Sequence, residues 1–301
     1  MNPGLPLITV CISTLQRPEL LKRLLTDLAR QDTNSLFTFS AVVADNDPDE
    51  SARPVVEMCR TTLPLSIQYV VEPRRSISHV RNKSLEPAKG EYVAFIDDDE
   101  FPTPEWLSTM FRSLNDYTVS GVFGPVRPHY DPATPSWVKK AGFYVRPEHP
   151  TGFPMPWQEC RTGNVLVRRN VLEQVNPVFR PEFGGGASDQ DLFRRLMERG
   201  HRFIWSNEAL VYEIVPPGRC KRRFLIRRAL LRGSISLRHP QNRLVNVLKA
   251  FIAVPLYALA LPFLQLRGHH FFMRHLIKLC DHLGRLLALF GFHPVRVRDM
   301  Q

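Results

Sequence analysis

Cysteine is scarce in this 301-residue sequence, and its pattern excludes a disulfide framework and a structural zinc site. Both would need paired or regularly spaced cysteines. The five cysteines are odd in number, widely separated and without CxxC or Cys/His ligand spacing: Cys11, Cys59, Cys160, Cys220 and Cys280. We therefore expect reduced, mostly buried thiols in an intracellular protein.

The N-terminus lacks the features of a secretory signal. Its apolar run, Leu5–Ile12, is short, follows no basic residues and continues directly into a strand-like pattern. We therefore expect the folded part of the chain to stay in the cytoplasm. Hydrophobic residues make up 44% of the sequence, which is enough for a sizeable core at this length and excludes a disordered or fibrous protein.

Acidic residues are almost absent from the last part of the chain. From Arg219 onward there are sixteen Lys and Arg residues against only two acids, Asp281 and Asp299. The net charge of this segment is +14, whereas that of the whole chain is +11. The residues before it therefore have a net charge of −3 and are slightly acidic. Such a basic segment attracts nucleic acid, anionic lipid or an anionic substrate.

The basic segment also contains a long apolar run, Leu244–Leu266, with a second, more polar one at Leu276–Phe292. Apolar length with flanking arginine favours a membrane surface over nucleic acid as the partner. Pro255, Pro262 and Lys249 interrupt the first run, and basic residues lie on both sides of it. We therefore favour monotopic, re-entrant or peripheral attachment over a full span or a soluble helical subdomain.

Strand-like and helix-like segments alternate over residues 7–97. We expect strands at Leu7–Ser13, Phe39–Asp45, Ser66–Val71 and Glu91–Asp97, and helices at Pro18–Gln31, Ala52–Thr62 and Ser78–Pro87. This alternation predicts an α/β domain with a mostly parallel, Rossmann-like sheet and helices on both faces. Ligands bind such sheets beyond the carboxyl ends of the strands, where Thr14, Asp45 and Asp97 fall.

The pattern is less regular after Trp106. Val119–Val126 is predicted as a strand, and Pro125–Pro156, rich in proline and aromatic residues, as a substrate-contacting region. Regular elements return at Cys160–Arg168, in a helix at Asp189–Gly200 and in a strand at Phe203–Trp205. We assign residues 1–215 to the α/β domain and residues 216–301 to a basic, helical, membrane-associating region.

Four acidic residues in succession, Asp97–Glu100, follow an apolar strand. Residues two apart on a strand project to the same side, so Asp97 and Asp99 are expected to face one ligand while Asp98 faces elsewhere. Carboxylates this close repel one another, and a divalent cation removes the repulsion. Oxygen ligands favour Mg²⁺ or Mn²⁺ over zinc. The alternative is a solvated acidic turn, and the buried strand before the acids favours the metal site.

A second candidate centre lies at Gly184–Gly186 and the helix start that follows. Glycine permits close backbone approach, and Asp189 places a carboxylate at the positive end of a helix. Two interpretations stay open at this point, a helix cap and a reactive carboxylate.

Together these segments resemble the family 2 glycosyltransferases, which have the GT-A fold. The resemblance covers about residues 6–215 and rests on five motifs in order: ITVCISTLQRPELL, VVADNDPD, ISHVRNKSL, EYVAFIDDDE and GGASDQDLFRRL. Each motif alone is weak evidence, but five in the right order are strong evidence. The sequence looks most like the succinoglycan-type β-1,4-glucosyltransferases of bacterial exopolysaccharide biosynthesis.

The resemblance implies a nucleotide-sugar donor. Thr14 and Arg17 are implied to lie near the nucleotide, Asp45 and Asn46 to recognise its base, and Arg81 to lie on a basic helix at the nucleotide side. Asn46 stands where many relatives have Asp. Its amide can still pair with a pyrimidine edge, so a UDP-sugar is the expected donor.

The resemblance also gives the acidic residues roles. Asp98 is implied to contact the ribose, and Asp97 and Asp99 to form the DxD pair that holds Mg²⁺ or Mn²⁺ on the diphosphate. Asp189 matches the catalytic base, with Ser188 in place of the usual Glu. We then expect Asp189 to take a proton from an acceptor hydroxyl, whose oxygen attacks the anomeric carbon and inverts it.

The expected partners are a glycan or lipid-linked sugar acceptor and the cytoplasmic face of the inner (plasma) membrane. No QxxRW motif of processive synthases follows Asp189, where the chain reads RCKRRFLIRR, so we expect one sugar per encounter. The alternative function is a nucleotidyltransferase that makes an activated sugar. That enzyme would need a glycine-rich phosphate loop after the first strand, where STLQRPELL has no glycine. No nucleic-acid partner is expected.

Overall fold

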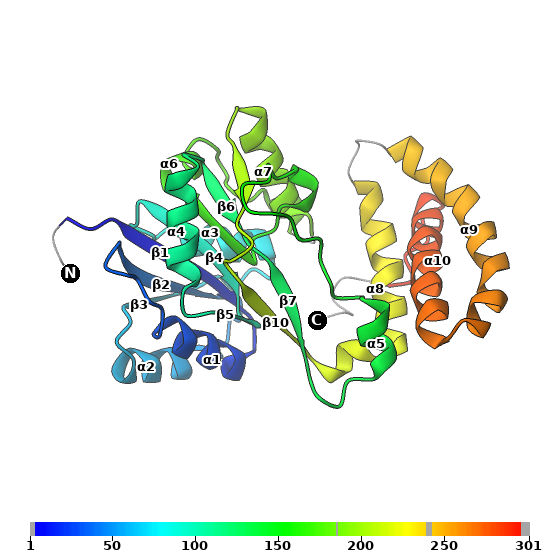
Figure 1. Ribbon diagram of the computed structural model, residues 1–301, viewed down its shortest axis with the longest axis horizontal. Coiled ribbons are helices and arrows are strands. Elements are labelled where there is room, and N and C mark those ends of the chain that lie inside the picture. Colours follow the sequence, from blue (N-terminus) through cyan, green and yellow to red (C-terminus); the bar gives the residue numbers. More distant parts are fainter. Residues whose placement is uncertain (1–3, 185, 239–242, 296–301) are drawn as a thin grey trace. The chain divides into compact units, whose positions relative to one another are not determined.

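The structure is a computed structural model that describes residues 4–184, 186–238 and 243–295 (Figure 1). It divides into two compact units, each considered by itself. The first comprises Met1–Pro128 and Arg146–Ile214, and the second comprises His129–Val145 and Val215–Gln301. The division after Ile214 lies one residue from the boundary predicted at residue 215, whereas residues 129–145 group with the second unit.

A seven-stranded sheet in the order β3-β2-β1-β4-β8-β6-β9 forms the centre of the first unit. β1, β2, β3 and β4 are parallel to one another, while β8 runs antiparallel to both β4 and β6. The mostly parallel sheet predicted from the sequence is thus confirmed. Its strands are β1 (Leu7–Thr14), β2 (Thr38–Asp45), β3 (Ile67–Val71), β4 (Tyr92–Asp97), β6 (Gly121–Phe123), β8 (Asn164–Arg168) and β9 (Phe203–Trp205).

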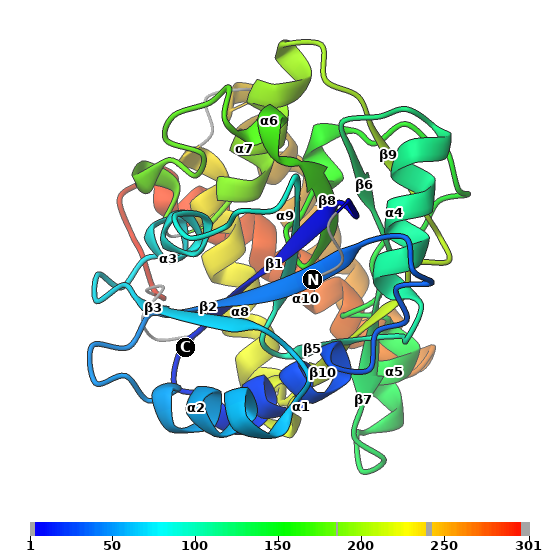
Figure 2. The same ribbon diagram turned by 90° about the vertical axis from the view of Figure 1, so that its left-hand side faces the viewer.

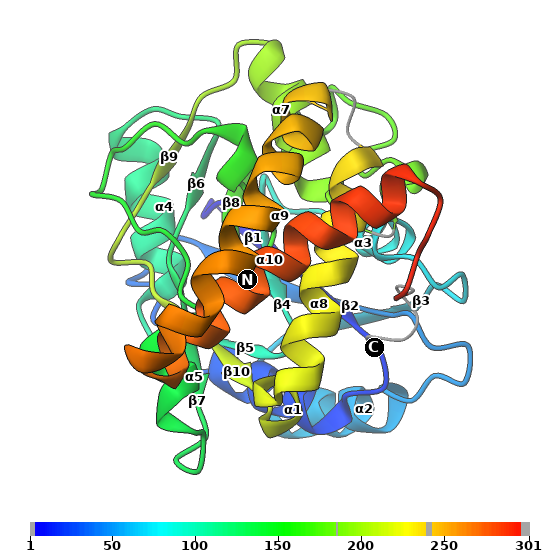
Figure 3. The ribbon, with the colours of Figure 1, turned by 90° about the vertical axis from the view of Figure 1, so that its right-hand side faces the viewer.

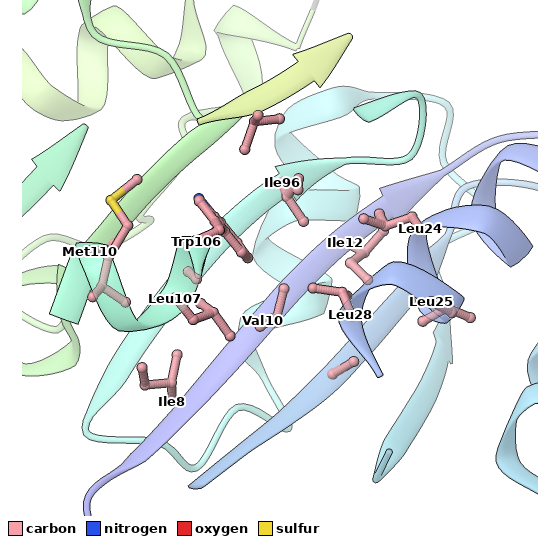
Figure 4. Close-up of a cluster of buried hydrophobic side chains, with 14 of the residues drawn as sticks. Ile8, Val10, Ile12, Leu24, Leu25, Leu28, Ile96, Trp106, Leu107 and Met110 are labelled. Atoms are coloured by element: carbon pink, nitrogen blue, oxygen red, sulfur yellow. The ribbon is translucent and has the colours of Figure 1, made fainter. Parts of the chain in front are cut away.

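Helices cover both faces of this sheet because successive strand side chains point to opposite faces. Ile8, Val10 and Ile12 of β1 pack on one face with α1, α2 and α4 (Figure 4). Cys11 and Phe95 belong to the opposite face with α3, α6 and α7. Figure 2 shows these three helices on the other side of the sheet from α1 and α2. The helices are α1 (Pro18–Leu28), α2 (Arg53–Thr62), α3 (Ile77–Leu85), α4 (Trp106–Asp116), α6 (Arg169–Leu172) and α7 (Ser188–Glu198).

The prediction of one strand over Val119–Val126 is wrong. β6 ends before Gly124, and β7 (Val126–Tyr130) belongs to a separate three-stranded sheet of order β5-β10-β7. A side chain at Gly124 would lie 2.7 Å from the Asn164 amide, and Pro125 has no N–H to continue a ladder. The chain changes sheets at this pair. The other two strands are β5 (Glu100–Pro102) and β10 (Val211–Val215), and short 3₁₀ turns lie at η1 (Trp157–Glu159) and η2 (Pro181–Phe183).

A buried asparagine fixes the beginning of β8. Asn164 accepts a hydrogen bond from the Trp106 indole at 2.8 Å and donates to the carbonyls of Pro125 at 2.9 Å and Ala209 at 2.8 Å. Its side chain therefore joins α4 to two loops across the sheet. The Asn164 side chain and its three partners are all buried. Each bond therefore satisfies a polar group that water cannot reach.

The second unit consists mainly of three long helices, with α10 between α8 and α9 (Figures 1 and 3). Gly233 of α8 and Gly284 of α10 let these two helices approach closely, because a β-carbon at either position would overlap a carbonyl of the other helix. Asp281 of α10 also pairs with Arg232 of α8 at 2.7 Å. The elements are α5 (Ser136–Ala141), η3 (Pro217–Cys220), α8 (Arg222–Ile235), η4 (Ser236–Arg238), α9 (Arg243–Leu266) and α10 (His269–Leu289).

The structure predicts that Asn164→Asp is strongly destabilising although it preserves shape. A carboxylate cannot donate to the Pro125 and Ala209 carbonyls and would face them with negative charge, so we expect the free energy of unfolding to fall by about 3 kcal/mol. Urea denaturation of both proteins measures the difference. Asn170→Asp, at an exposed position, is the matched control. Equal stability of the two variants would contradict the role given to Asn164.

Candidate active site

The ends of three neighbouring parallel strands bring polar residues to one edge of the sheet. β1 ends at Thr14, β2 at Asp45 and β4 at Asp97, and the register pairs Thr14 with Asp45 and Ser13 with Asp97. Thr14 and Asp45 are buried, whereas the Asp97 side chain is 40% exposed. This edge, where ligands of α/β sheets bind, is where the sequence placed them.

Asp98 is fixed through both of its oxygens. The Thr14 hydroxyl donates to Oδ2 at 2.8 Å, and Arg17 Nη1 donates to Oδ1 at 3.0 Å. The same Arg17 nitrogen lies 3.2 Å from Asp99 Oδ2. Burial raises the pKa of Asp98 to about 6, although Arg17 acts in the opposite direction. A further positive charge at this turn would therefore favour the ionised carboxylates.

Arg81 connects the end of β4 with the beginning of α7. This buried side chain of α3 forms an ion pair with Asp189, and lies 3.3 Å from Ser188 Oγ and 3.6 Å from Asp97 Oδ1. The sequence placed Arg81 only at the nucleotide side. In the structure it contacts one predicted metal ligand and the predicted base, and so brings the two predicted centres together.

Asp189 is held by other segments and does not cap its helix. Its Oδ2 accepts hydrogen bonds from the Thr162 N–H and hydroxyl, both at 3.2 Å. α7 begins after Ala187, and no side-chain cap bond is found at its start in the described residues, which exclude Gly185 of the predicted glycine run. Burial raises the pKa of Asp189, but Arg81, Thr162 and Ser188 outweigh it, so the net shift is downward. The carboxylate is therefore ionised and able to accept a proton.

Glu100 lies beneath the acidic turn and is completely enclosed. Its Oε2 accepts a hydrogen bond from the Asp97 N–H at 3.0 Å, and β5–β10 pairing sets it opposite Glu213. Arg146 lies between these two glutamates, 2.5 Å from Glu213 and 4.0 Å from Glu100. Burial raises the pKa of Glu100 well above its usual value. Arg146 thus offsets the repulsion that two opposed glutamates would otherwise have.

The described site carries more acid than base. Three arginines each approach two carboxylates: Arg17 with Asp98 and Asp99, Arg81 with Asp97 and Asp189, and Arg146 with Glu100 and Glu213. Six carboxyl groups therefore face three guanidinium groups, and the acids remain in excess when Glu100, whose pKa is raised, is counted as neutral. This excess of acid favours the binding of a divalent cation. The atoms that could coordinate it are all oxygen, which is the ligand type that Mg²⁺ prefers.

A cation held here would need ligands from outside the protein. Among the residues that the structure describes, no group of three or more His, Cys, Asp or Glu side chains has the arrangement of a metal site. Mg²⁺ and similar ions at phosphate-binding sites commonly use one or two carboxylates and take the remaining ligands from phosphate and water. Asp97 and Asp99 fit a site of this kind, with two carboxylates from the protein and the other ligands from phosphate and water.

Asp45 uses its carboxylate inside the protein. Oδ1 accepts a hydrogen bond from the Asp47 N–H at 3.0 Å, and Oδ2 accepts from the Ala52 N–H at 2.9 Å and from the Tyr69 hydroxyl at 2.8 Å. The side chain is fully buried. Asp45 thus shapes the turn after β2, and its contact with a base stays a prediction.

Asn46 likewise joins two loops. Its amide nitrogen donates to the carbonyls of Glu72 at 2.6 Å and Arg74 at 2.8 Å, while its oxygen accepts from the Ser76 N–H at 3.2 Å. These bonds tie the end of β2 to the segment after β3. The pyrimidine edge proposed for Asn46 from the sequence would have to compete with them, so this role also stays a prediction.

Sequence reasoning missed Thr162, Arg146 and Glu213. The register explains why Thr162 reaches the site: β8 is antiparallel to β4 and pairs Asn164 with Ile96, so residues just before β8 lie at the carboxyl end of β4. Arg146 and Glu213 come from segments without a recognisable motif. The antiparallel direction of β8 is the one signal that would have located Thr162.

The chain is similar to known proteins over most of its length. The profile of glycosyl transferase family 2 matches residues 9–175. The succinoglycan biosynthesis protein ExoM of Rhizobium meliloti is 34% identical over 231 residues, which is 75% of this chain and 72% of that protein.

Solved structures share the GT-A fold. A mannosyltransferase of Pyrobaculum calidifontis in complex with GDP-mannose and Mn²⁺ aligns over 96% of this chain and 88% of its own, with a TM-score of 0.65 and 21% identity. S. aureus TarS in complex with UDP aligns over 94% of this chain and 91% of its own, with a TM-score of 0.55 and 17% identity. The profile match and the ExoM alignment show that this chain belongs to glycosyl transferase family 2 and is a glycosyltransferase.

Proposed function

We propose that this protein transfers a sugar from a nucleotide-sugar, expected to be a UDP-sugar, to a hydroxyl of a glycan or lipid-linked acceptor, with inversion at the anomeric carbon. The observation that carries the proposal is the Arg81 bridge, which brings the proton-accepting Asp189 beside the acidic end of β4. Relatives support it, because ExoM functions in succinoglycan biosynthesis and TarS has been solved with UDP.

Asp97 and Asp99 are the residues that would hold Mg²⁺ or Mn²⁺ together with the donor diphosphate. The solved mannosyltransferase with GDP-mannose and Mn²⁺ supports this choice of ion. When bound, the cation supplies positive charge that stabilises the leaving nucleoside diphosphate. Thr14, Arg17 and Asp98 form a fixed group next to this pair, consistent with a ribose contact for Asp98.

Asp189 is the proposed base. It accepts the proton of the acceptor hydroxyl as that oxygen bonds to the anomeric carbon, and the bond to the diphosphate breaks on the opposite face. Thr162 fixes the orientation of the Asp189 carboxylate, and Arg81 keeps it ionised. A single displacement needs no carboxylate nucleophile. Membership of family 2 sets the nucleotidyltransferase alternative aside.

Asp99→Ala is expected to remove transfer without lowering stability. The change deletes one of the crowded carboxylates rather than a packing group, and loss of such a charge-stabilising position costs about 10² or more in rate. Release of nucleoside diphosphate from UDP-glucose, UDP-N-acetylglucosamine and GDP-mannose, with Mn²⁺ and membrane extract, measures activity and identifies the donor. Asp116→Ala, an exposed aspartate on α4, is the control. Full activity of the wild type in EDTA would refute the metal site.

Asp189→Asn is expected to separate donor binding from turnover. Asparagine keeps the shape but cannot take a proton, so the turnover number should fall by about 10² to 10⁴ while nucleotide affinity stays near the wild-type value. Calorimetry with the nucleotide and the same release assay measure the two quantities. Glu198→Gln, at an exposed position on the same helix, is the control. Wild-type turnover of Asp189→Asn would show that another group is the base.

We also propose that the second unit attaches the enzyme to the cytoplasmic face of the inner membrane. Leu244–Leu266 is the one described helix segment that is long and apolar enough to cross a bilayer. Its most apolar 18 residues have a mean hydropathy of 2.0, and only 11% of them are buried. A core helix would be mostly covered. Its outward apolar side chains are Leu244, Val245, Leu248, Phe251, Ile252, Leu256, Leu259, Phe263 and Leu266.

The packing of α9 favours a helix lying flat in the interface. α10 packs against α9 on one side and α8 on the other, and carries Arg274, Lys278, Asp281 and Arg285. If α9 crossed the bilayer, it would either leave α10 or draw these charges into the hydrocarbon core, at about 2.5 to 3.5 kcal/mol each. Lying flat, α9 buries its apolar side while the basic residues meet anionic headgroups.

Attachment is tested by two substitutions on the outward side of α9, Leu259→Glu with Phe263→Glu. These charges would face the acyl chains, so the variant is expected to stay in the supernatant when sedimented with phosphatidylglycerol-containing vesicles that bring down the wild type. Tyr117→Glu, at an exposed aromatic position in the first unit, is the control. A wild type that remains soluble in cell fractions at both low and high salt would rule out attachment.

A flat helix is distinguished from a span by labelling Arg267→Cys, which lies between α9 and α10. The five natural cysteines are buried and give little background. In sealed membrane vesicles, an impermeant maleimide is expected to react only from the cytoplasmic side. Labelling only from the opposite side would show that α9 crosses the bilayer.

A further inference from the structure

Glu100 is the one acidic residue of the Asp97–Glu100 turn that has no role in the reaction proposed above. It is only 2% exposed, so it cannot serve as an open ligand to a substrate. Within the described residues its Oε1 has no hydrogen-bond donor, and Arg146 Nη1 lies 4.0 Å from it. A buried carboxylate with one oxygen unpaired is costly and calls for an explanation.

One end of the explanation is the metal-binding turn. Glu100 Oε2 accepts the hydrogen bond of the Asp97 N–H at 3.0 Å. The bond closes the turn from Asp97 to Glu100 and fixes the backbone that carries Asp97 and Asp99. The carboxylate thus acts on the main chain of the predicted metal ligands rather than on the ion.

The other end is the segment that holds the base. A β-carbon built on Gly163 would lie 2.5 Å from Glu100 Oε1 and 3.1 Å from Oε2, so the carboxylate rests directly on the Gly163 backbone. Gly163 follows Thr162, whose N–H and hydroxyl hold Asp189. The absence of a side chain at Gly163 is what makes room for this contact.

We infer that Glu100 is a positioning residue that sets the spacing between the metal carboxylates and the catalytic base. Its carboxylate is a spacer between the Asp97 turn and the Thr162–Gly163 segment, while Arg81 spans the same two centres directly. The length of the glutamate side chain matters for this role, and its charge does not. The inference rests on the proposed roles of Asp97, Asp99 and Asp189.

Glu100→Asp tests the inference because it retains the carboxylic acid but shortens the side chain by one methylene. The acid would no longer reach both the Asp97 N–H and Gly163, and we expect the turnover number to fall by about 10- to 100-fold, as for a misplacement near 1 Å. Glu100→Gln keeps the length and is expected to retain most activity. Glu105→Asp, at an exposed glutamate nearby, controls for the substitution itself.

A second pair of variants tests the contact from the other side. Gly163→Ala adds a methyl where the carboxylate lies and is expected to lower turnover as Glu100→Asp does, whereas Gly218→Ala, with no atom within 4 Å of the added carbon, is expected to be neutral. Circular dichroism melting shows whether each variant is folded. Wild-type turnover in folded Glu100→Asp, or equal losses in Glu100→Asp and Glu100→Gln, would overturn the inference.

A double-mutant cycle separates positioning from a general loss of stability. If Glu100 acts by aligning Asp189 with the donor site, Glu100→Asp should have little further effect in an Asp189→Asn background. Losses that multiply would show that Glu100 acts independently of the base and would overturn the inference. Failure of the proposed function is recognised separately, because Asp189→Asn alone would then keep wild-type turnover.

Discussion

Charge balance at the end of β4 is the constraint on which the site depends. Six carboxylates lie there, and three arginines from different parts of the chain each approach two of them. Arg17 follows β1, Arg81 belongs to α3 and Arg146 begins the second part of the first unit. The fold must therefore bring these three segments to the same sheet edge before the acids can be buried. An excess of acid remains, which a divalent cation would offset while it binds the diphosphate of the proposed donor.

Because each arginine pairs with two acidic residues, a substitution of one arginine affects two parts of the site. Removing Arg81 would leave Asp97 and Asp189 without their shared partner, and so would affect both the proposed metal ligand and the proposed base. Mutational loss at such a bridge cannot be assigned to one centre. Asp189 is a better probe of the base, because Thr162 still holds the side chain at that position after an isosteric change.

The sequence predicted the sheet edge well because local patterns determine it. Apolar β-branched runs ending in Thr14, Asp45 and Asp97 need only the rule that parallel strands align their carboxyl ends. The break after β6 was missed because it depends on Asn164, a residue distant in sequence that occupies the space beside Gly124. Patterns in a single segment contain no information about such a contact.

The partners of the site residues were equally beyond local patterns. Asp45 and Asn46 belong to a sequence motif, yet their hydrogen bonds are made with Tyr69 of β3 and with Glu72 and Arg74 of the loop after it. Thr162 reached Asp189 because β8 reverses direction, which a run of apolar residues does not reveal.

The same limit applies to the apolar helix α9. Composition identifies Leu244–Leu266 as able to cross a bilayer, and length alone, at about 1.5 Å per residue, would permit it. What opposes a crossing is its neighbour, since α10 is joined to α8 through Asp281, Arg232 and the closely packed Gly233 and Gly284. A charged helix fixed in this way opposes a crossing of the bilayer by α9. Tertiary packing is therefore the argument for the proposed flat arrangement, because hydropathy alone fits either one.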